Sequence, residues 1–86
     1  MPRISQFFGI TIAMFYRDHA PPHFHAYYQD AEALIDIRTF ALLEGRLPPR
    51  QLGLAVEWAA KRQAELLRNW DRARSNQPLD AVLPLE

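Results

Sequence analysis

The sequence predicts an α+β fold in which a small antiparallel sheet of three to four strands is covered by one long C-terminal amphipathic helix. Apolar residues alternate with a period of two in the first half of the chain, and the period becomes helical from Pro49 onward. Turn-forming residues separate the segments. Eighty-six residues have room for one core, so we expect a single domain over 1–86, with the sheet at about 3–44, the helix at about 49–75 and an apolar tail at 77–86.

Four segments have the composition of strands. The first is rich in β-branched and aromatic residues and follows a bend at Gly9. Pro21 and Pro22 then interrupt the sheet, because proline cannot donate to a strand ladder. The expected strands are 10–16, 23–28, 31–38 and a short segment at 40–43.

The second and third strands predict a register. Phe24, Ala26 and Tyr28 share one apolar face, which has to pair with the apolar face of the strand that follows. A hairpin centred on Gln29-Asp30 satisfies this requirement. The expected pairs are Tyr28 with Ala31, Phe24 with Ile35, Tyr27 with Glu32, His25 with Leu34 and His23 with Asp36.

A single helix is expected from Pro49, a residue suited to a first helical position, to the stop signal at 75–78. Its apolar stripe is interrupted only by Gln63. Leu54 and Trp58 project away from this stripe. Either the apolar tail folds back over them, or they form a contact patch for another chain.

All three histidines lie in the segment Asp18-His19-Ala20-Pro21-Pro22-His23-Phe24-His25. Imidazole accepts and donates protons near neutral pH, so this segment is the candidate site. His23 and His25 should leave the sheet on its solvent-facing side, where Asp36 can orient His23. The candidate catalytic residues are His23, His25, His19 and Asp36, and the candidate substrate-binding residues are Arg17, Tyr27, Arg38 and Arg46.

Three hypotheses fit these residues. The first is metal-independent acid–base chemistry on a phosphodiester, which requires no cofactor. The second is a divalent-metal site with His19, His23 and His25 as nitrogen ligands and Asp18 or Asp36 as an oxygen ligand. In the third, the histidines only shape a rigid turn. The residues alone leave the three open.

Other classes of protein are disfavoured. The chain has no cysteine, which excludes disulfides, thiolate metal sites and a cysteine nucleophile. It has no glycine-rich phosphate loop, and its formal net charge of zero disfavours non-specific nucleic-acid binding. Because no segment resembles a signal peptide or a membrane span, we expect a cytoplasmic location.

Motifs along nearly the whole chain resemble the bacterial family called domain of unknown function 4160. The string Asp-His-x-Pro-Pro-His-Phe-His-Ala at 18–26 is the most specific of them. The other matching residues are Met1-Pro2, Ile4-Ser5, Phe7-Phe8-Gly9-Ile10, Ile35-Asp36-Ile37, Glu44-Gly45-Arg46-Leu47-Pro48, Glu57-Trp58 and Asn69-Trp70. The resemblance implies a small cytoplasmic protein, often encoded beside a partner of the domain of unknown function 2442 type. It supplies no established reaction.

From these observations we expect the toxin-like half of a toxin–antitoxin type module, acting on RNA through the histidine cluster. The alternative is a non-enzymatic, antitoxin-like or regulatory module that binds its partner through Leu54 and Trp58. The third possible function is that of a metal-binding protein. The partner in each case is a small cognate protein, RNA or a second copy of the chain, and no membrane is expected.

Overall fold

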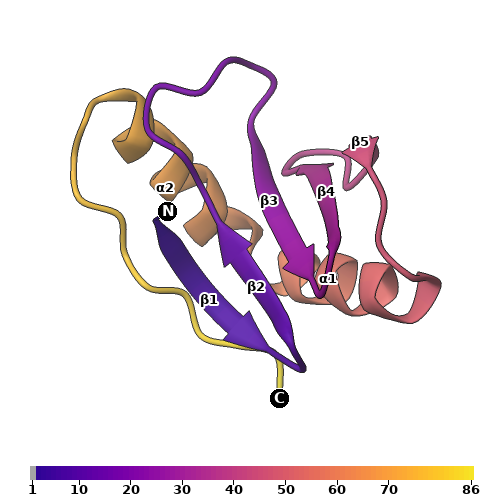
Figure 1. The fold of residues 1–86 in the computed structure, drawn as a ribbon. Coiled ribbons are helices and arrows are strands. Elements are labelled where there is room, and N and C mark those ends of the chain that lie inside the picture. The colour runs from indigo at the N-terminus through magenta and orange to yellow at the C-terminus, as the bar shows by residue number, and fades with distance from the viewer. Residues whose placement is uncertain (1) are drawn as a thin grey trace.

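The computed structural model describes residues 2–86, so Met1, which belongs to the family pattern, lies outside the described residues. Five strands form one antiparallel sheet whose spatial order is the chain order, and two helices follow (Figure 1). The α+β class and the antiparallel sheet agree with the sequence prediction. The elements are β1 (Arg3–Phe7), β2 (Ile10–Ala13), β3 (His23–Tyr28), β4 (Ala31–Asp36), β5 (Leu42–Gly45), α1 (Pro49–Lys61) and α2 (Gln63–Arg74).

The predicted register of β3 and β4 is confirmed. His23 pairs with Asp36, Phe24 with Ile35 and Tyr28 with Ala31, and the pairs between them follow the same alignment. Phe24, Ile35 and their neighbours Ala26 and Ala33 are fully buried. The buried apolar face therefore selects this register, because a slip of one strand by one residue would turn its two apolar side chains away from the core.

The sheet has five strands rather than the three to four expected: it was expected to begin at about residue 3, but β1 was not among the four segments expected to be strands. Ser5 and Gln6 make this segment polar, yet Ile4 and Phe7 are buried and the strand pairs with β2. Phe8 and Gly9 connect the two strands with φ angles of 48° and 78°. Positive φ at both turn residues matches the twist of a two-residue hairpin, which explains the bend predicted at Gly9.

The last strand begins two residues later than predicted, at Leu42 instead of position 40. The carboxylate of Asp36 accepts hydrogen bonds from the backbone N–H groups of Arg38 and Thr39, and Phe40 N–H donates to the Asp36 carbonyl oxygen. These bonds close a turn immediately after β4. The segment that was expected to extend β4 to Arg38 therefore forms the turn.

The expectation of one long helix is wrong, because the helix breaks at Arg62. This residue has φ −117° and ψ 19°, and it separates α1 from α2. The side-chain amide of Gln63, the one polar residue in the predicted apolar stripe, donates to the carbonyl oxygen of Ile37 at 2.9 Å. The two shorter helices take different directions along the sheet (Figure 1).

The C-terminal tail folds back along the sheet, which was one of the two alternatives left open. The indole N–H of Trp58 donates to the Leu83 carbonyl oxygen at 2.8 Å, and Val82 N–H donates to the Ile4 carbonyl oxygen at 2.7 Å. Trp58 is fully buried and packs against Phe7 and Phe24, and Leu54 is half-buried against the same core. Trp58 therefore does not belong to a surface patch, the other alternative, whereas a contact of Leu54 with another chain stays a prediction.

The end of α2 agrees with the predicted stop signal. Asn76 adopts φ 61°, and Gln77 N–H donates to the Arg72 carbonyl oxygen at 2.8 Å. This arrangement satisfies carbonyl groups of the last helical turn, as in a Schellman motif. Within residues 2–86, neither helix has the length and apolar character needed to cross a membrane.

Two glycines provide a matched test of the β4–β5 contact. Gly45 has φ +70°, and a Cβ there would collide with the Glu32 carbonyl oxygen, whereas a Cβ on Gly53 in α1 would meet open space. We expect Gly45→Ala to lower the free energy of unfolding by about 1–3 kcal/mol, and Gly53→Ala to raise it by about 0.5–1 kcal/mol. Urea unfolding measures both, and equal effects of the two substitutions would contradict the steric argument.

Candidate functional site

The loop between β2 and β3 positions Asp18 beside the start of β3. Arg17 adopts φ 58°, and its backbone N–H donates to the carbonyl oxygen of Ala73 near the end of α2 at 3.2 Å. The loop is thereby attached to the helix. The next residue, Asp18, turns its carboxylate towards the β3 histidines, and its side chain keeps 16% of its surface exposed.

One oxygen of Asp18 lies close to two imidazoles. Its Oδ2 atom is 2.9 Å from Nε2 of His23 and 3.3 Å from Nε2 of His25. The other oxygen, Oδ1, accepts the backbone N–H of His19 at 2.9 Å. The two imidazole rings on β3 have centroids 5.3 Å apart, so one molecule or ion can contact both.

The opposite nitrogens of the same two rings face acceptors. Nδ1 of His23 lies 2.7 Å from the Pro21 carbonyl oxygen, and Nδ1 of His25 lies 3.0 Å from Oε2 of Glu32. A carbonyl oxygen only accepts hydrogen bonds, so Nδ1 of His23 bears the proton. His25 has a carboxylate at each ring nitrogen, and the shorter contact, to Glu32, favours the proton on Nδ1 over Nε2. Both Nε2 atoms are then lone-pair donors in the neutral rings.

This arrangement leaves Asp18 Oδ2 facing two nitrogens that have no proton to give. An ionised carboxylate and an imidazole lone pair repel each other, so each short contact requires either an additional proton or a cation between the two atoms. Two additional protons, one on each Nε2 atom, would bring two positive charges. One divalent ion bound between the carboxylate and the two nitrogens would bring the same charge.

The three donor atoms have the spacing of metal ligands. The candidate ligand atoms of Asp18, His23 and His25 all lie within 4.8 Å of one another. With metal–ligand distances of about 2.0–2.1 Å, two ligands are about 2.9 Å apart at a right angle and about 3.4 Å apart at the tetrahedral angle. The observed oxygen–nitrogen distances of 2.9 and 3.3 Å correspond to these two values.

The expectation that both imidazoles lie on a solvent-exposed face is wrong for His23. This residue is 3% exposed and its ring packs against Trp70 of α2, with centroids 5.2 Å apart. The His25 side chain is 12% exposed and lies edge-on to Phe15. His19 differs from both, because 93% of its side chain is exposed and its Nδ1 atom lies 3.2 Å from Asp18 Oδ1.

Asp36 does not orient His23, although the two residues are paired across the strands. Its carboxylate is engaged by the backbone of the turn after β4, as described above. The sequence reasoning identified the register but assigned the wrong acid to the histidine. The short Asp36 side chain reaches its own turn, and Asp18 supplies the carboxylate instead.

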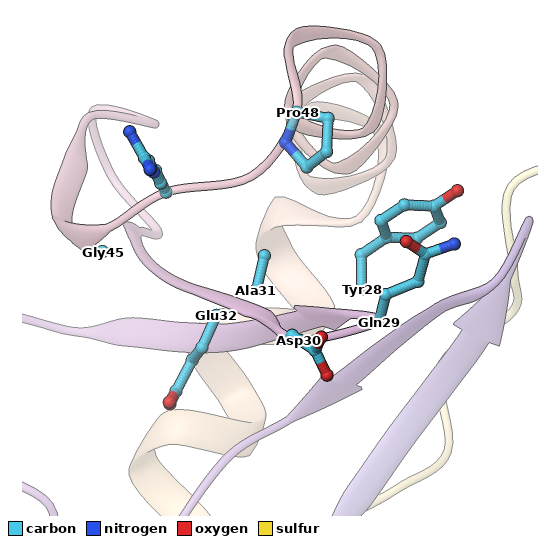
Figure 2. A pocket seen from close by; sticks show the side chains of 8 residues that line it. Tyr28, Gln29, Asp30, Ala31, Glu32, Gly45 and Pro48 are labelled. Carbon is cyan, nitrogen blue, oxygen red and sulfur yellow. The ribbon is translucent and has the colours of Figure 1, made fainter.

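Glu32 is the residue that sequence reasoning missed. It was placed opposite Tyr27 and given no role, yet it contacts His25 diagonally across the strands. Figure 2 shows the Glu32 side chain directed to the opposite side of β4 from Ala31 and Pro48. The signal was present in the register, since diagonal neighbours in a sheet lie within reach of long side chains.

An open pocket of about 410 Å³ lies over the cluster. Its lining includes three carboxylates and no lysine or arginine, and consists of Asp18, His19, His25, Glu32, Leu34, Glu44 and Gly45. None of the four candidate substrate-binding residues lines it: Arg17, Arg38 and Arg46 are exposed, and Tyr27 is half-buried. Arg46 lines a separate pocket of about 460 Å³ between the β3–β4 turn and Pro48 (Figure 2).

Tyr27 and Asp18 have shifted pKa values. Burial raises the pKa of Tyr27, and the charge of Glu32 raises it further, so Tyr27 stays neutral. Burial also raises the pKa of Asp18, but three effects outweigh it and leave this pKa below its ordinary value: the hydrogen bond that His25 donates once its Nε2 is protonated, the hydrogen bond from the His19 backbone N–H, and the charge of His23 in its protonated form. Asp18 is therefore ionised at neutral pH.

A family model described as Domain of unknown function (DUF4160) matches residues 9–71. The matched segment includes Asp18, His23, His25 and Glu32. The resemblance predicted from the sequence motifs is confirmed, and the partner of the domain of unknown function 2442 type stays a prediction. No curated protein and no solved structure matches the chain significantly.

The lowered pKa of Asp18 predicts a pH-dependent contribution to stability. In the metal-free protein, additional protons on Nε2 make His23 and His25 hydrogen-bond donors to the Asp18 carboxylate. Hydrogen bonds to charged groups contribute about 1.5–3 kcal/mol, so we expect Asp18→Asn to lower the free energy of unfolding of the metal-free protein by about this amount at pH 7. Asp18 in the unfolded chain titrates near its ordinary value of 3.8 and the folded-state pKa is lower. The higher stability of the wild type is therefore fully present at pH values above the pKa of Asp18 in the unfolded chain. It is lost as the pH falls through the lower pKa of Asp18 in the folded protein.

Urea unfolding of both proteins at a series of pH values from neutral to strongly acidic measures this difference. Asp71→Asn is the control, because this carboxyl is exposed and makes no ion pair with the described residues. A stability difference between wild type and Asp18→Asn that persists unchanged in acid would contradict a lowered pKa of Asp18 in the folded protein.

Proposed function

The chain belongs to the DUF4160 family, and we propose that it is a metal-binding protein whose centre holds one divalent transition-metal ion between Asp18, His23 and His25. The observation that supports this proposal is the orientation of the two imidazoles. Both Nδ1 atoms face acceptors while both Nε2 atoms face the same carboxylate oxygen. This is the arrangement of metal-bound histidines, whose second ring nitrogen donates to a carboxylate or a backbone carbonyl.

The donor set indicates the class of ion. Two imidazoles and one carboxylate suit zinc and iron(II), and also cobalt(II) as a spectroscopic substitute, better than magnesium or calcium, which prefer oxygen ligands. The site is also partly formed before an ion arrives. His23 is held by Trp70 and Pro21, and His25 is held by Phe15 and Glu32, so little side-chain freedom is lost on binding.

The acid–base mechanism on RNA has less support. It needs two imidazoles that reach the substrate, whereas His23 is buried, and it needs cationic groups beside the phosphate. The pocket instead has three carboxylates in its lining, which repel a polyanion. The toxin-like role, the RNA substrate and the cognate partner protein stay predictions from the sequence.

Zinc titration of protein prepared without a histidine tag tests the proposal. We expect a stoichiometry of about one by calorimetry and by elemental analysis of the dialysed protein. Loss of a residue that only hydrogen-bonds to a metal ligand lowers metal affinity about 10–100-fold, and we expect His25→Ala and Asp18→Ala to lower the zinc affinity by more than that. Asp71→Asn should bind as the wild type does. Circular dichroism checks that each variant is folded, and folded wild-type protein that binds no zinc would contradict the proposal.

Glu32→Gln tests the supporting role of the second carboxylate separately. The amide cannot favour the Nδ1 proton of His25 as a carboxylate does, so we expect zinc affinity to fall about 10–100-fold while the stoichiometry stays at about one. Glu57→Gln is the matched control, because Glu57 is exposed on α1 and forms only an ion pair with Lys61. Equal affinities of the Glu32 and Glu57 variants would show that the contact between Glu32 and His25 does not support the ligand.

A further inference from the structure

We propose that the metal centre is hydrolytic, that its substrate is an uncharged ester or amide rather than a phosphodiester, and that His19 accepts the proton of the attacking water. This inference rests on the proposed function. It follows from three further observations: the number of donor atoms, the charge of the pocket over them and the position of the third histidine.

The number of donors leaves one coordination position open. Structural zinc sites have four protein ligands, whereas catalytic sites have three and keep a position for water or substrate. Among residues 2–86, the cluster with metal-ligand spacing has three members, Asp18, His23 and His25. Two of these, Asp18 and His25, line the open pocket, and buried His23 does not. Water or a substrate could therefore reach an ion held there from the side of the open pocket.

The charge of the pocket selects the substrate. Asp18, Glu32 and Glu44 line it, and their three negative charges exceed the two positive charges of a divalent ion. An anionic phosphodiester would be repelled even from the loaded site, since unit charges a few ångströms apart interact with about 1–4 kcal/mol near a protein surface. An uncharged acyl group meets no such barrier, and Leu34 offers it an apolar wall.

His19 is the base within reach of this pocket. It lines the pocket together with Asp18 and His25, and 93% of its side chain is exposed, so its ring can move and exchange protons with solvent. Its Nδ1 atom lies 3.2 Å from Asp18 Oδ1, whereas the β3 histidines contact Oδ2, and the centroids of the His19 and His23 rings are 6.3 Å apart.

The reaction balances without a further reagent. A divalent ion held by Asp18, His23 and His25 would supply a Lewis acid for the acyl carbonyl and for the water. The water oxygen bonds to the acyl carbon, one water proton passes to Nε2 of His19, and the bond from acyl carbon to the alkoxy oxygen or amide nitrogen breaks. The leaving group departs with the electron pair of that bond, and His19 later returns its proton to the leaving group or to solvent.

Hydrolysis of 4-nitrophenyl acetate by zinc-loaded full-length protein tests the proposal, with bis(4-nitrophenyl) phosphate as the anionic comparison. We expect the acceleration over the uncatalysed reaction to be at least about tenfold larger for the ester, to disappear with a chelator and to return with zinc. His19→Ala should still bind one zinc ion, lose at least about tenfold in kcat with little change in KM, and regain activity with added imidazole.

The outcomes separate this inference from the proposed function. Protein that binds one zinc ion but hydrolyses neither compound faster than free zinc overturns the hydrolytic role and leaves the metal centre intact. A larger acceleration of the phosphodiester overturns the substrate class. Loss of zinc affinity in His19→Ala makes His19 a ligand and overturns its role as the base. Protein that binds no zinc overturns the proposed function itself.

Discussion

The rest of the site depends on the contacts of the Asp18 carboxylate. One of its oxygens lies within 3.3 Å of the Nε2 atoms of both β3 histidines. The two histidines are fixed by β3, whereas Asp18 belongs to the loop that precedes it. The loop in turn is attached to α2 through Arg17 and Ala73. Sheet, loop and helix are therefore all needed to bring the three donors together.

The sequence predicted the parts of the fold that local pattern determines. The alternation in residues 23–36 was sufficient to give the β3–β4 register, because only one alignment buries both apolar faces. Strand β1 and the break at Arg62 depend on distant contacts instead. The backbone of Ile4 in β1 bonds to the C-terminal tail, and the side chain of Gln63 bonds to the backbone after β4. Neither the strand nor the helix break therefore follows from the local sequence pattern alone.

The sequence predicted that the histidines lie together, but it did not predict which atoms they contact. The spacing of His23 and His25 placed them together, and the register placed Asp36 opposite His23. Two effects that a pairing scheme omits then decide the contacts. A short aspartate prefers the N–H groups of its own turn, and the path of the 14–22 loop, which no periodicity describes, determines where the Asp18 carboxylate lies.

The burial of His23 is better explained by a cation site than by acid–base catalysis. A general acid has to exchange protons with substrate and solvent, which a residue 3% exposed under Trp70 does poorly. A metal ligand has the opposite requirement, because it should stay neutral, keep one rotamer and direct a single lone pair at the ion. Pro21 and Trp70 impose these conditions on His23, and Glu32 and Phe15 impose them on His25. The same packing that removes the imidazoles from solvent therefore orients them for a ligand that needs no proton exchange.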